Sequence, residues 1–86
     1  MSVYVDAARH SLGRMTMCHM MADTTDELLA MVDRIGVQRK WIQDAGTPRE
    51  HFDVCREKRA EAVKAGALEV STRDLFLLIQ RKRRET

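Results

Sequence analysis

The spacing of apolar and polar residues changes several times along the chain, and each change indicates a different element. Residues 2–6 (SVYVD) and 14–21 (RMTMCHMM) are typical of strands, because β-branched, aromatic or alternating apolar residues dominate them. In the second strand, alternation predicts that Met15, Met17, His19 and Met21 share one face, opposite Thr16, Cys18 and Met20. Residues 7–13 between them are expected to form a loop. Further short strands are expected at 37–43, 51–54 and 67–70.

Three segments have helical periodicity. Residues 22–36 place Leu28, Met31, Val32 and Ile35 on one stripe, with Asp23 or Thr24 as N-cap and Gly36 at the end. Residues 55–66 are rich in good helix formers and stop at Gly66. Residues 71–85 open with S-T-R-D, which resembles a capping box with aspartate in place of glutamate.

The order of these elements predicts one small domain over residues 1–86. From residue 24 onward helices alternate with strands, which favours a partly parallel sheet. We therefore expect an α/β fold, with a small α+β fold as the alternative: three helices around a small mixed sheet in the order β-β-α-β-α-β-α. Residues 81–86 (RKRRET) would form a basic C-terminal tail.

Composition narrows the class of protein. At 86 residues and 44% hydrophobic content, the chain has enough apolar residues for one core, which a homo-oligomer would help to stabilise. No apolar run reaches the ~18 residues of a membrane span, and no signal peptide is evident. Two cysteines in such a chain are expected to be free thiols. These features indicate a cytoplasmic protein with no membrane partner.

The net charge of +2 is unevenly distributed. Residues 81–86 carry four basic groups and one acidic group, so the remaining 80 residues have a net charge of −1. A nucleic-acid partner would therefore depend on the tail, which has no interleaved aromatic residues. Favourable charge at the C-terminus of a helix is the simpler explanation of the tail.

The H-F-D triplet places His51 and Asp53 on one side of an extended segment. A histidine beside a carboxylate acts as a general base, or binds an anion once protonated, and His19 would belong to the same polar site. The alternative is structural: Asp53 would cap the following helix and His51 would close the preceding loop.

Arginines supply further candidates for an anion site. Arg39 lies at the end of an expected strand and Arg59, beside Lys58, lies in the first turns of the second helix, where a phosphate can bind. Arg14 follows Gly13 at the rim of a loop that also contains Arg9 and His10. An ordinary solvated surface explains each of these arginines equally well.

No metal site is assigned. A zinc site would have to combine Cys18, His19, His51, Asp53 and Cys55, but the chain lacks the spacings typical of zinc ligands. Adjacent Cys18 and His19 on a strand would also point to opposite faces, so the cysteines are interpreted as small buried hydrophobes. The fingerprints GxxxxGK[ST], GxGxxG, GxSxG and HExxH are absent from the sequence.

Several short blocks resemble one family. The segments VYVD, GRMTMCHMMAD, DELLAM, IGVQRKW, HFDV, KRAEAVKAGA and STRDL, in this order, resemble the domain-of-unknown-function 4031 family of small bacterial and phage proteins. The family has no established activity. If a phage encodes this chain, the cytoplasm expected for it is that of the host. The resemblance implies a polar set of His19, Arg39, His51 and Asp53, together with Asp6 and Asp23. This chain has Ala7 where phage-type members commonly carry aspartate, so a pair of acids at positions 6 and 7 is not available.

Three functional hypotheses follow. The first is a binding module for a small anionic ligand, phosphorylated or nucleotide-like, with His19, Arg39, His51, Asp53, Arg14 and Arg59 as ligand-binding residues. The second is a phosphoesterase or nuclease in which Asp6, Asp23 and Asp53 hold a divalent metal and a histidine acts as base. The third is a protein- or nucleic-acid-interaction protein that uses the tail. The sequence leaves open whether the chain is an enzyme.

Overall fold

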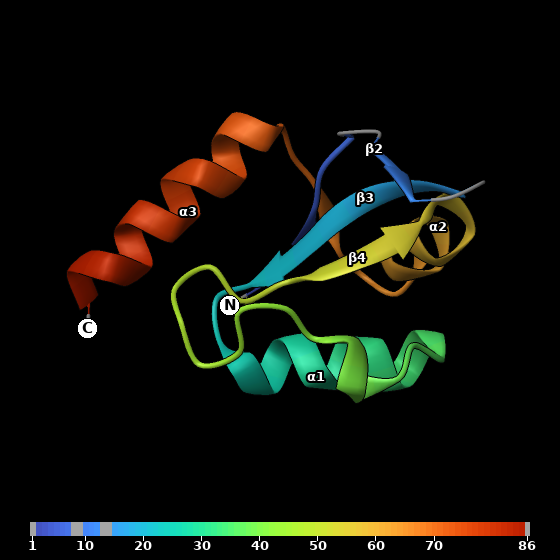
Figure 1. The fold of residues 1–86 in the computed structure, drawn as a ribbon, viewed down its shortest axis with the longest axis horizontal. Coiled ribbons are helices and arrows are strands. Elements are labelled where there is room, and N and C mark those ends of the chain that lie inside the picture. The colour runs from blue at the N-terminus through green and yellow to red at the C-terminus, as the bar shows by residue number, and fades with distance from the viewer. Residues whose placement is uncertain (1, 8–9, 13–14, 86) are drawn as a thin grey trace.

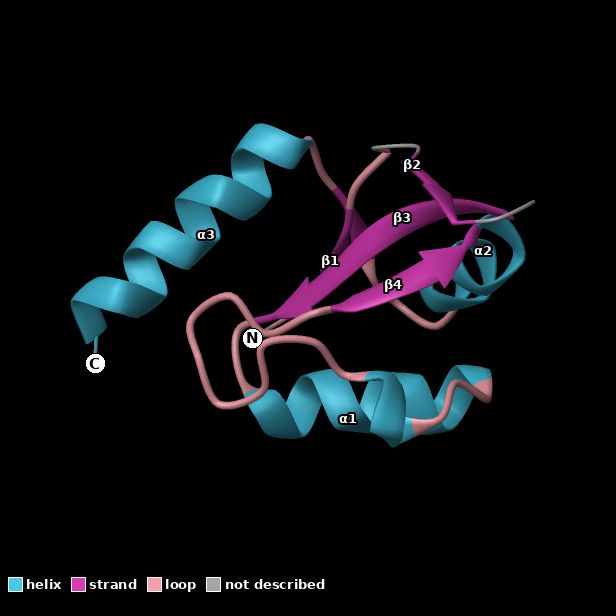
Figure 2. Cartoon of the chain, viewed as in Figure 1, coloured by secondary structure: helices cyan, strands magenta, loops and turns pink. Residues whose placement is uncertain are grey.

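A computed structural model gives the fold of residues 2–7, 10–12 and 15–85, with only the backbone described for 10–12 and 15. The strands are β1 (Val3–Val5), β2 (His10–Leu12), β3 (Met15–Ala22), β4 (Phe52–Cys55) and β5 (Leu68–Glu69). The helices are α1 (Thr25–Ile35), α2 (Arg56–Lys64) and α3 (Thr72–Glu85), with a short 3₁₀ turn, η1 (Arg39–Trp41). Figure 1 and Figure 2 show the sheet between α1 on one side and α3 on the other.

The long strand β3 is the centre of the sheet. β1 and β2 pair antiparallel with successive parts of one edge of β3, and β4 pairs antiparallel with its other edge. β5 adds to the outer edge of β1 as the parallel pair. The mixed sheet, the three helices and the α+β class are thus confirmed, with parallel pairing limited to β1 and β5.

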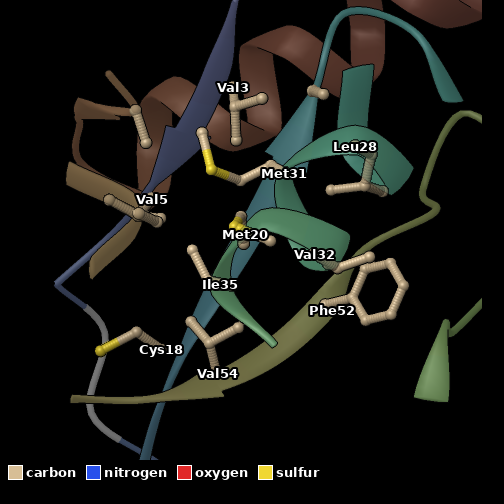
Figure 3. Packing of buried hydrophobic residues seen from close by; sticks show 13 residues of the cluster. Val3, Val5, Cys18, Met20, Leu28, Met31, Val32, Ile35, Phe52 and Val54 are labelled. Carbon is tan, nitrogen blue, oxygen red and sulfur yellow. The ribbon is translucent and has the colours of Figure 1, made fainter. Parts of the chain in front are cut away.

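Each face of the sheet has its own apolar cluster. α1 and α2 cover the larger one, in which Cys18 and Met20 of β3 pack with Leu28, Val32 and Phe52 (Figure 3). On the opposite face, Met21 packs with Leu75 and Leu78 of α3. The predicted alternation along β3 is therefore confirmed, because Cys18 and Met20 enter the larger core while His19 and Met21 face α3.

The helix ends follow their sequence signals. The Thr24 hydroxyl accepts a hydrogen bond from the Glu27 backbone N–H (3.2 Å), and Gly36 ends α1 with φ +78°. At the start of α3 the Asp74 N–H donates to the Ser71 hydroxyl, and the Ser71 N–H donates to the Asp74 carboxylate, both at 3.0 Å. The predicted capping box with aspartate is therefore confirmed, and hydrogen bonds from the Ser71 backbone and side chain lower the pKa of Asp74.

Two predicted elements are wrong. Residues 37–43 do not form a strand: residues 39–41 form η1, and only Gln43 makes an isolated bridge, to His51. The turn is favoured because the Arg39 guanidinium binds Asp33 through two hydrogen bonds of 2.9 and 2.6 Å. Residues 7–13 are not all loop, because residues 10–12 form β2. This strand pairs with residues 15–17 of β3, the part of that edge that β1 does not cover.

Asp23 does not cap α1, because its carboxylate is committed elsewhere. It accepts hydrogen bonds from the Ser2 N–H (2.7 Å) and the Tyr4 hydroxyl (3.0 Å), and it binds Arg81. Lys82 donates to the Ala22 carbonyl at 3.1 Å. Residues 81–85 thus continue α3 and fasten it to the end of β3. Within the described ranges, no helix has the length and apolarity needed to cross a membrane.

Candidate functional site

The centre of the site is a buried carboxylate bound to a histidine. Asp6 directly follows β1 and is fully buried. Its Oδ1 accepts the His19 backbone N–H at 2.8 Å, and its Oδ2 lies 2.8 Å from His19 Nδ1. The Asp6 N–H in turn donates to the His19 carbonyl, so the pair extends the β1–β3 ladder by one rung. The sheet itself therefore fixes the orientation of the His19 ring.

Two more segments hold Asp6 in place. The Thr72 hydroxyl, at the start of α3, donates to Asp6 Oδ2 at 3.1 Å. From the other side of the sheet, Arg59 Nε donates to the Asp6 backbone carbonyl at 2.8 Å, and its Nη1 pairs with Glu69 at 3.1 Å. Asp6 and Thr72 follow the two parallel strands, so the site lies at the C-terminal ends of that pair, where ligands commonly bind in α/β sheets.

β4 brings a second histidine and a second carboxylate to His19. His19 and Asp53 are directly opposite each other in the β3–β4 register. Asp53 Oδ1 lies 4.0 Å from His19 Nε2 and 3.7 Å from His51 Nε2. The two imidazole rings meet edge to face with centroids 5.7 Å apart. The predicted association of these three residues is therefore present.

The loop before β4 positions His51 and Asp53. His51 Nδ1 lies 2.8 Å from the Arg49 carbonyl, and Gln43 Nε2 donates to Asp53 Oδ2 at 2.6 Å. Buried Glu50 accepts the Thr25 hydroxyl and the Gly46 N–H, which ties the same loop to the start of α1. Asp53 is thus part of β4 rather than a cap of α2, while His51 does close its loop.

A pocket of about 340 Å³ opens between the sheet and α3 at this point. The residues that line it are of two kinds, polar and apolar. The polar lining comprises Asp6, His19, Arg49, His51 and Thr72, and the apolar lining comprises Met21, Leu75, Phe76 and Ile79. Phe76 is 58% exposed and provides an open aromatic face on α3. This volume falls at the lower end of the range for small-molecule sites.

Of the predicted arginines, the two that the structure describes, Arg39 and Arg59, do not line this pocket. Arg39 is bound to Asp33, and this ion pair lowers the pKa of Asp33 and raises that of Arg39. Arg59 supports Asp6 from behind through its backbone carbonyl. Lys58 donates to the Ile35 carbonyl at the end of α1. Arg14 lies outside the described residues. The roles of these residues in ligand binding stay predictions.

The fold separates members of both metal-binding combinations considered from sequence. Asp23 pairs with Ser2 at one end of β1 while Asp6 pairs with His19 at the other. His19 and Asp23 are four residue steps apart along this extended segment, which is about 13 Å. Cys18 lies in the core on the opposite face of β3 from His19. Among the described residues, no group of three histidine, cysteine, aspartate or glutamate side chains is arranged so that it could hold a metal ion.

Two residues of the site had no recognisable signal in the sequence. Arg49 belongs to a segment that looks like any polar loop, and Thr72 looks like part of a helix cap. Asp6 entered only through the family resemblance. A buried aspartate at the end of a predicted strand is the one clue that could have marked it, since buried carboxylates require partners.

Comparison with known proteins agrees with this resemblance. No curated protein and no solved structure matches the chain. The family model described as "Protein of unknown function (DUF4031)" matches residues 3–82, which include every residue of the pocket. The chain therefore belongs to the DUF4031 family of proteins of unknown function.

Proposed function

We propose that the protein binds a small anionic ligand, phosphorylated or nucleotide-like, in the pocket between the sheet and α3. The observation that supports this proposal is that one pocket is lined both by polar and charged side chains and by apolar ones. A ligand with a charged group and a flat apolar part is complementary to both.

The polar lining residues supply hydrogen-bond donors for an anion. Arg49 contributes a permanent positive charge, and its guanidinium fork matches phosphate or carboxylate oxygens. His19 and His51 add ring nitrogens that become donors on protonation. Asp6 does not oppose an anion as strongly as its charge suggests, because it is fully buried behind His19 and bound by His19 and Thr72.

The apolar wall favours a ligand larger than inorganic phosphate. Leu75 is buried in the α3 cluster, whereas Phe76 is more than half exposed beside the pocket. An aromatic ring at this position can stack on a base or another flat group, which contributes about 1–3 kcal/mol in nucleic-acid complexes. We therefore expect nucleotides to bind more tightly than phosphate alone.

Hydrolysis is a second candidate function. The observation that favours it is the Asp6–His19 hydrogen bond, since a carboxylate that orients an imidazole is the usual support of a general base. The separation of Asp23 from Asp6 removes the three-aspartate metal site from this candidate.

Thermal unfolding in the presence of EDTA tests the binding proposal. The panel comprises inorganic phosphate, nucleoside mono- and diphosphates, dinucleotides and phosphorylated metabolites. A ligand at ~100 times its Kd adds about 2.7 kcal/mol, which raises the Tm of a domain this small by on the order of 10 °C.

Matched variants identify the site. Arg49→Ala should reduce the ligand-induced rise in Tm. Arg56 is another exposed arginine and lines a different pocket, so Arg56→Ala should leave that rise unchanged. Phe76→Ala should weaken the binding of nucleotides more than the binding of phosphate. Leu77→Ala, on the same helix, is the control. No shift from any compound, or equal shifts in Arg49→Ala and the wild type, would contradict the proposal.

A further inference from the structure

The fixed charges among the described residues that line the pocket cancel. Arg49 carries a permanent positive charge and Asp6 a negative one. The residues that α3 contributes to the lining are uncharged, namely Thr72, Leu75, Phe76 and Ile79. Glu50 is turned toward the start of α1, where it is hydrogen-bonded. His19 and His51 are the remaining titratable groups of this lining, so their protonation decides whether the described lining is neutral or positive.

The hydrogen bonds behind the two imidazole rings determine which nitrogen can take up a proton. His51 Nδ1 lies 2.8 Å from the Arg49 carbonyl, and His19 Nδ1 lies 2.8 Å from the Asp6 carboxylate. A carbonyl and a carboxylate only accept hydrogen bonds, so each neutral ring carries its proton on Nδ1. A further proton therefore binds at Nε2.

The two rings differ in what balances their charge once they are protonated. His19 is in direct hydrogen-bond contact with the Asp6 carboxylate at 2.8 Å. For His51, the carboxylate oxygen that faces Nε2 is Asp53 Oδ1 at 3.7 Å, which is beyond hydrogen-bond distance. Arg49 in the same pocket opposes a further positive charge, and so does protonated His19, because the ring centroids are 5.7 Å apart. The charge of a protonated His51 thus depends more on what the pocket contains.

We propose that the protein binds an anion together with a proton, and that His51 takes up this proton at Nε2. The protonated ring adds a positive charge to that of Arg49, and the anion balances both. The His51 side chain is only 19% exposed, so solvent screens this attraction weakly. The coupling rests on the proposed function, because both concern the same pocket. Its distinct consequence is that the affinity for an anion rises as the pH falls through the range in which histidine titrates.

Anions of constant charge test the coupling. Phosphate monoesters are unsuitable, because their own second ionisation at about pH 6 falls in the same range. The probes are therefore inorganic sulfate and a dinucleoside monophosphate, whose phosphodiester keeps its charge. Isothermal titration at pH 6, 7 and 8 gives the Kd, and repetition in buffers of different ionisation enthalpy counts the protons taken up. The Kd should rise roughly tenfold from pH 6 to pH 8, with uptake of about half a proton or more per anion at pH 7.

Variants separate the proton from the fixed charge. His51→Gln cannot ionise, so its Kd should change less than about twofold between pH 6 and pH 8, without proton uptake. Arg49→Ala should raise the Kd at every pH but keep the pH dependence, because the backbone carbonyl that holds His51 remains. Arg56→Ala, at an exposed arginine of a different pocket, should resemble the wild type in both respects.

NMR titration of the wild type gives a readout that requires no variant. Either probe should raise the pH at which the His51 ring protons titrate by about one unit, and should shift the titration of His19 less.

Three results would overturn the proposal: equal Kd values at pH 6 and pH 8, proton uptake that persists in His51→Gln, or failure of both probes to bind at pH 6. If nucleotides still raised the Tm in any of these cases, the proposed function would stand without the coupling. No Tm shift from any compound at any pH would refute both.

Discussion

Replacing Asp6 by asparagine should reverse the tautomer of His19 while preserving the fold. The His19 backbone N–H can only donate, so the amide oxygen of the new side chain must take the place of Oδ1. The amide NH₂ then occupies the place of Oδ2, opposite His19 Nδ1. Since that NH₂ is a donor, the ring must accept at Nδ1 and carry its proton on Nε2.

The cost to stability follows from the bonds at Oδ2. This oxygen accepts two hydrogen bonds, from His19 Nδ1 and from the Thr72 hydroxyl. Hydrogen bonds to a charged group contribute about 1.5–3 kcal/mol and neutral ones about 0.5–1.5 kcal/mol. Replacing two bonds of the first kind by two of the second should lower the free energy of unfolding by about 2 kcal/mol, or the Tm by about 10 °C. Asp6→Ala should lose about 4 kcal/mol, because it also leaves the His19 N–H without its acceptor.

Two measurements check this reasoning. Thermal and urea denaturation give the stability change, and ¹⁵N NMR of the histidine rings identifies the protonated nitrogen. Asp26→Asn, the same chemical change at an exposed site, controls for lost charge. If Asp6→Asn were as stable as the wild type and His19 still carried its proton on Nδ1, the assigned role of the Asp6 hydrogen bonds would be wrong.

Three other variants test the fold. Leu28→Ala, at a fully buried core position, should lose about 2–5 kcal/mol in urea denaturation, whereas Leu77→Ala, at a half-exposed one, should lose far less. Thr24→Ala should cost about 1 kcal/mol through loss of the N-cap of α1, and Thr24→Ser should restore most of it. Burial acts to raise the pKa of Asp23, but hydrogen bonds from Ser2, Arg81 and Tyr4 outweigh it and lower the pKa. The stability that Asp23 provides is therefore complete above about pH 4 and is lost as the pH falls through its folded-state pKa. In a denaturation series from pH 7 to pH 2, the free energy of unfolding of Asp23→Asn should fall less than that of the wild type.

Local patterns predicted the parts of the fold that local forces determine. The alternation in β3 predicted that His19 and Cys18 lie on opposite faces of the strand. The S-T-R-D motif predicted the start of α3. The segment 37–43 contains Val37, Trp41 and Ile42, residue types that favour strands. There the ion pair between Arg39 and Asp33 and a hydrogen bond from the Val37 N–H to the Val32 carbonyl outweigh β propensity.

The candidate site could be predicted only in part, because long-range pairing assembles it. The H-F-D triplet and the family resemblance pointed to His19, His51 and Asp53. The bond between Asp6 and Thr72 joins residues 66 positions apart, and no spacing in the sequence indicates it. Arg39 was a candidate because of its charge. The structure pairs it with Asp33 near the end of α1 instead of with the site.

The bond between Asp6 and Thr72 also has a consequence for the order of events during synthesis. β1 leaves the ribosome early, but its final strand partner, β5, and the hydroxyl that binds Asp6 emerge only after most of the chain. The apolar wall of the pocket, which includes Phe76 and Ile79, emerges later still. A nascent chain can therefore form the β3–β4 ladder, with its two histidines and Asp53, before it has a pocket. The polar residues of β3 and β4 would assemble first, and the pocket would close around them last.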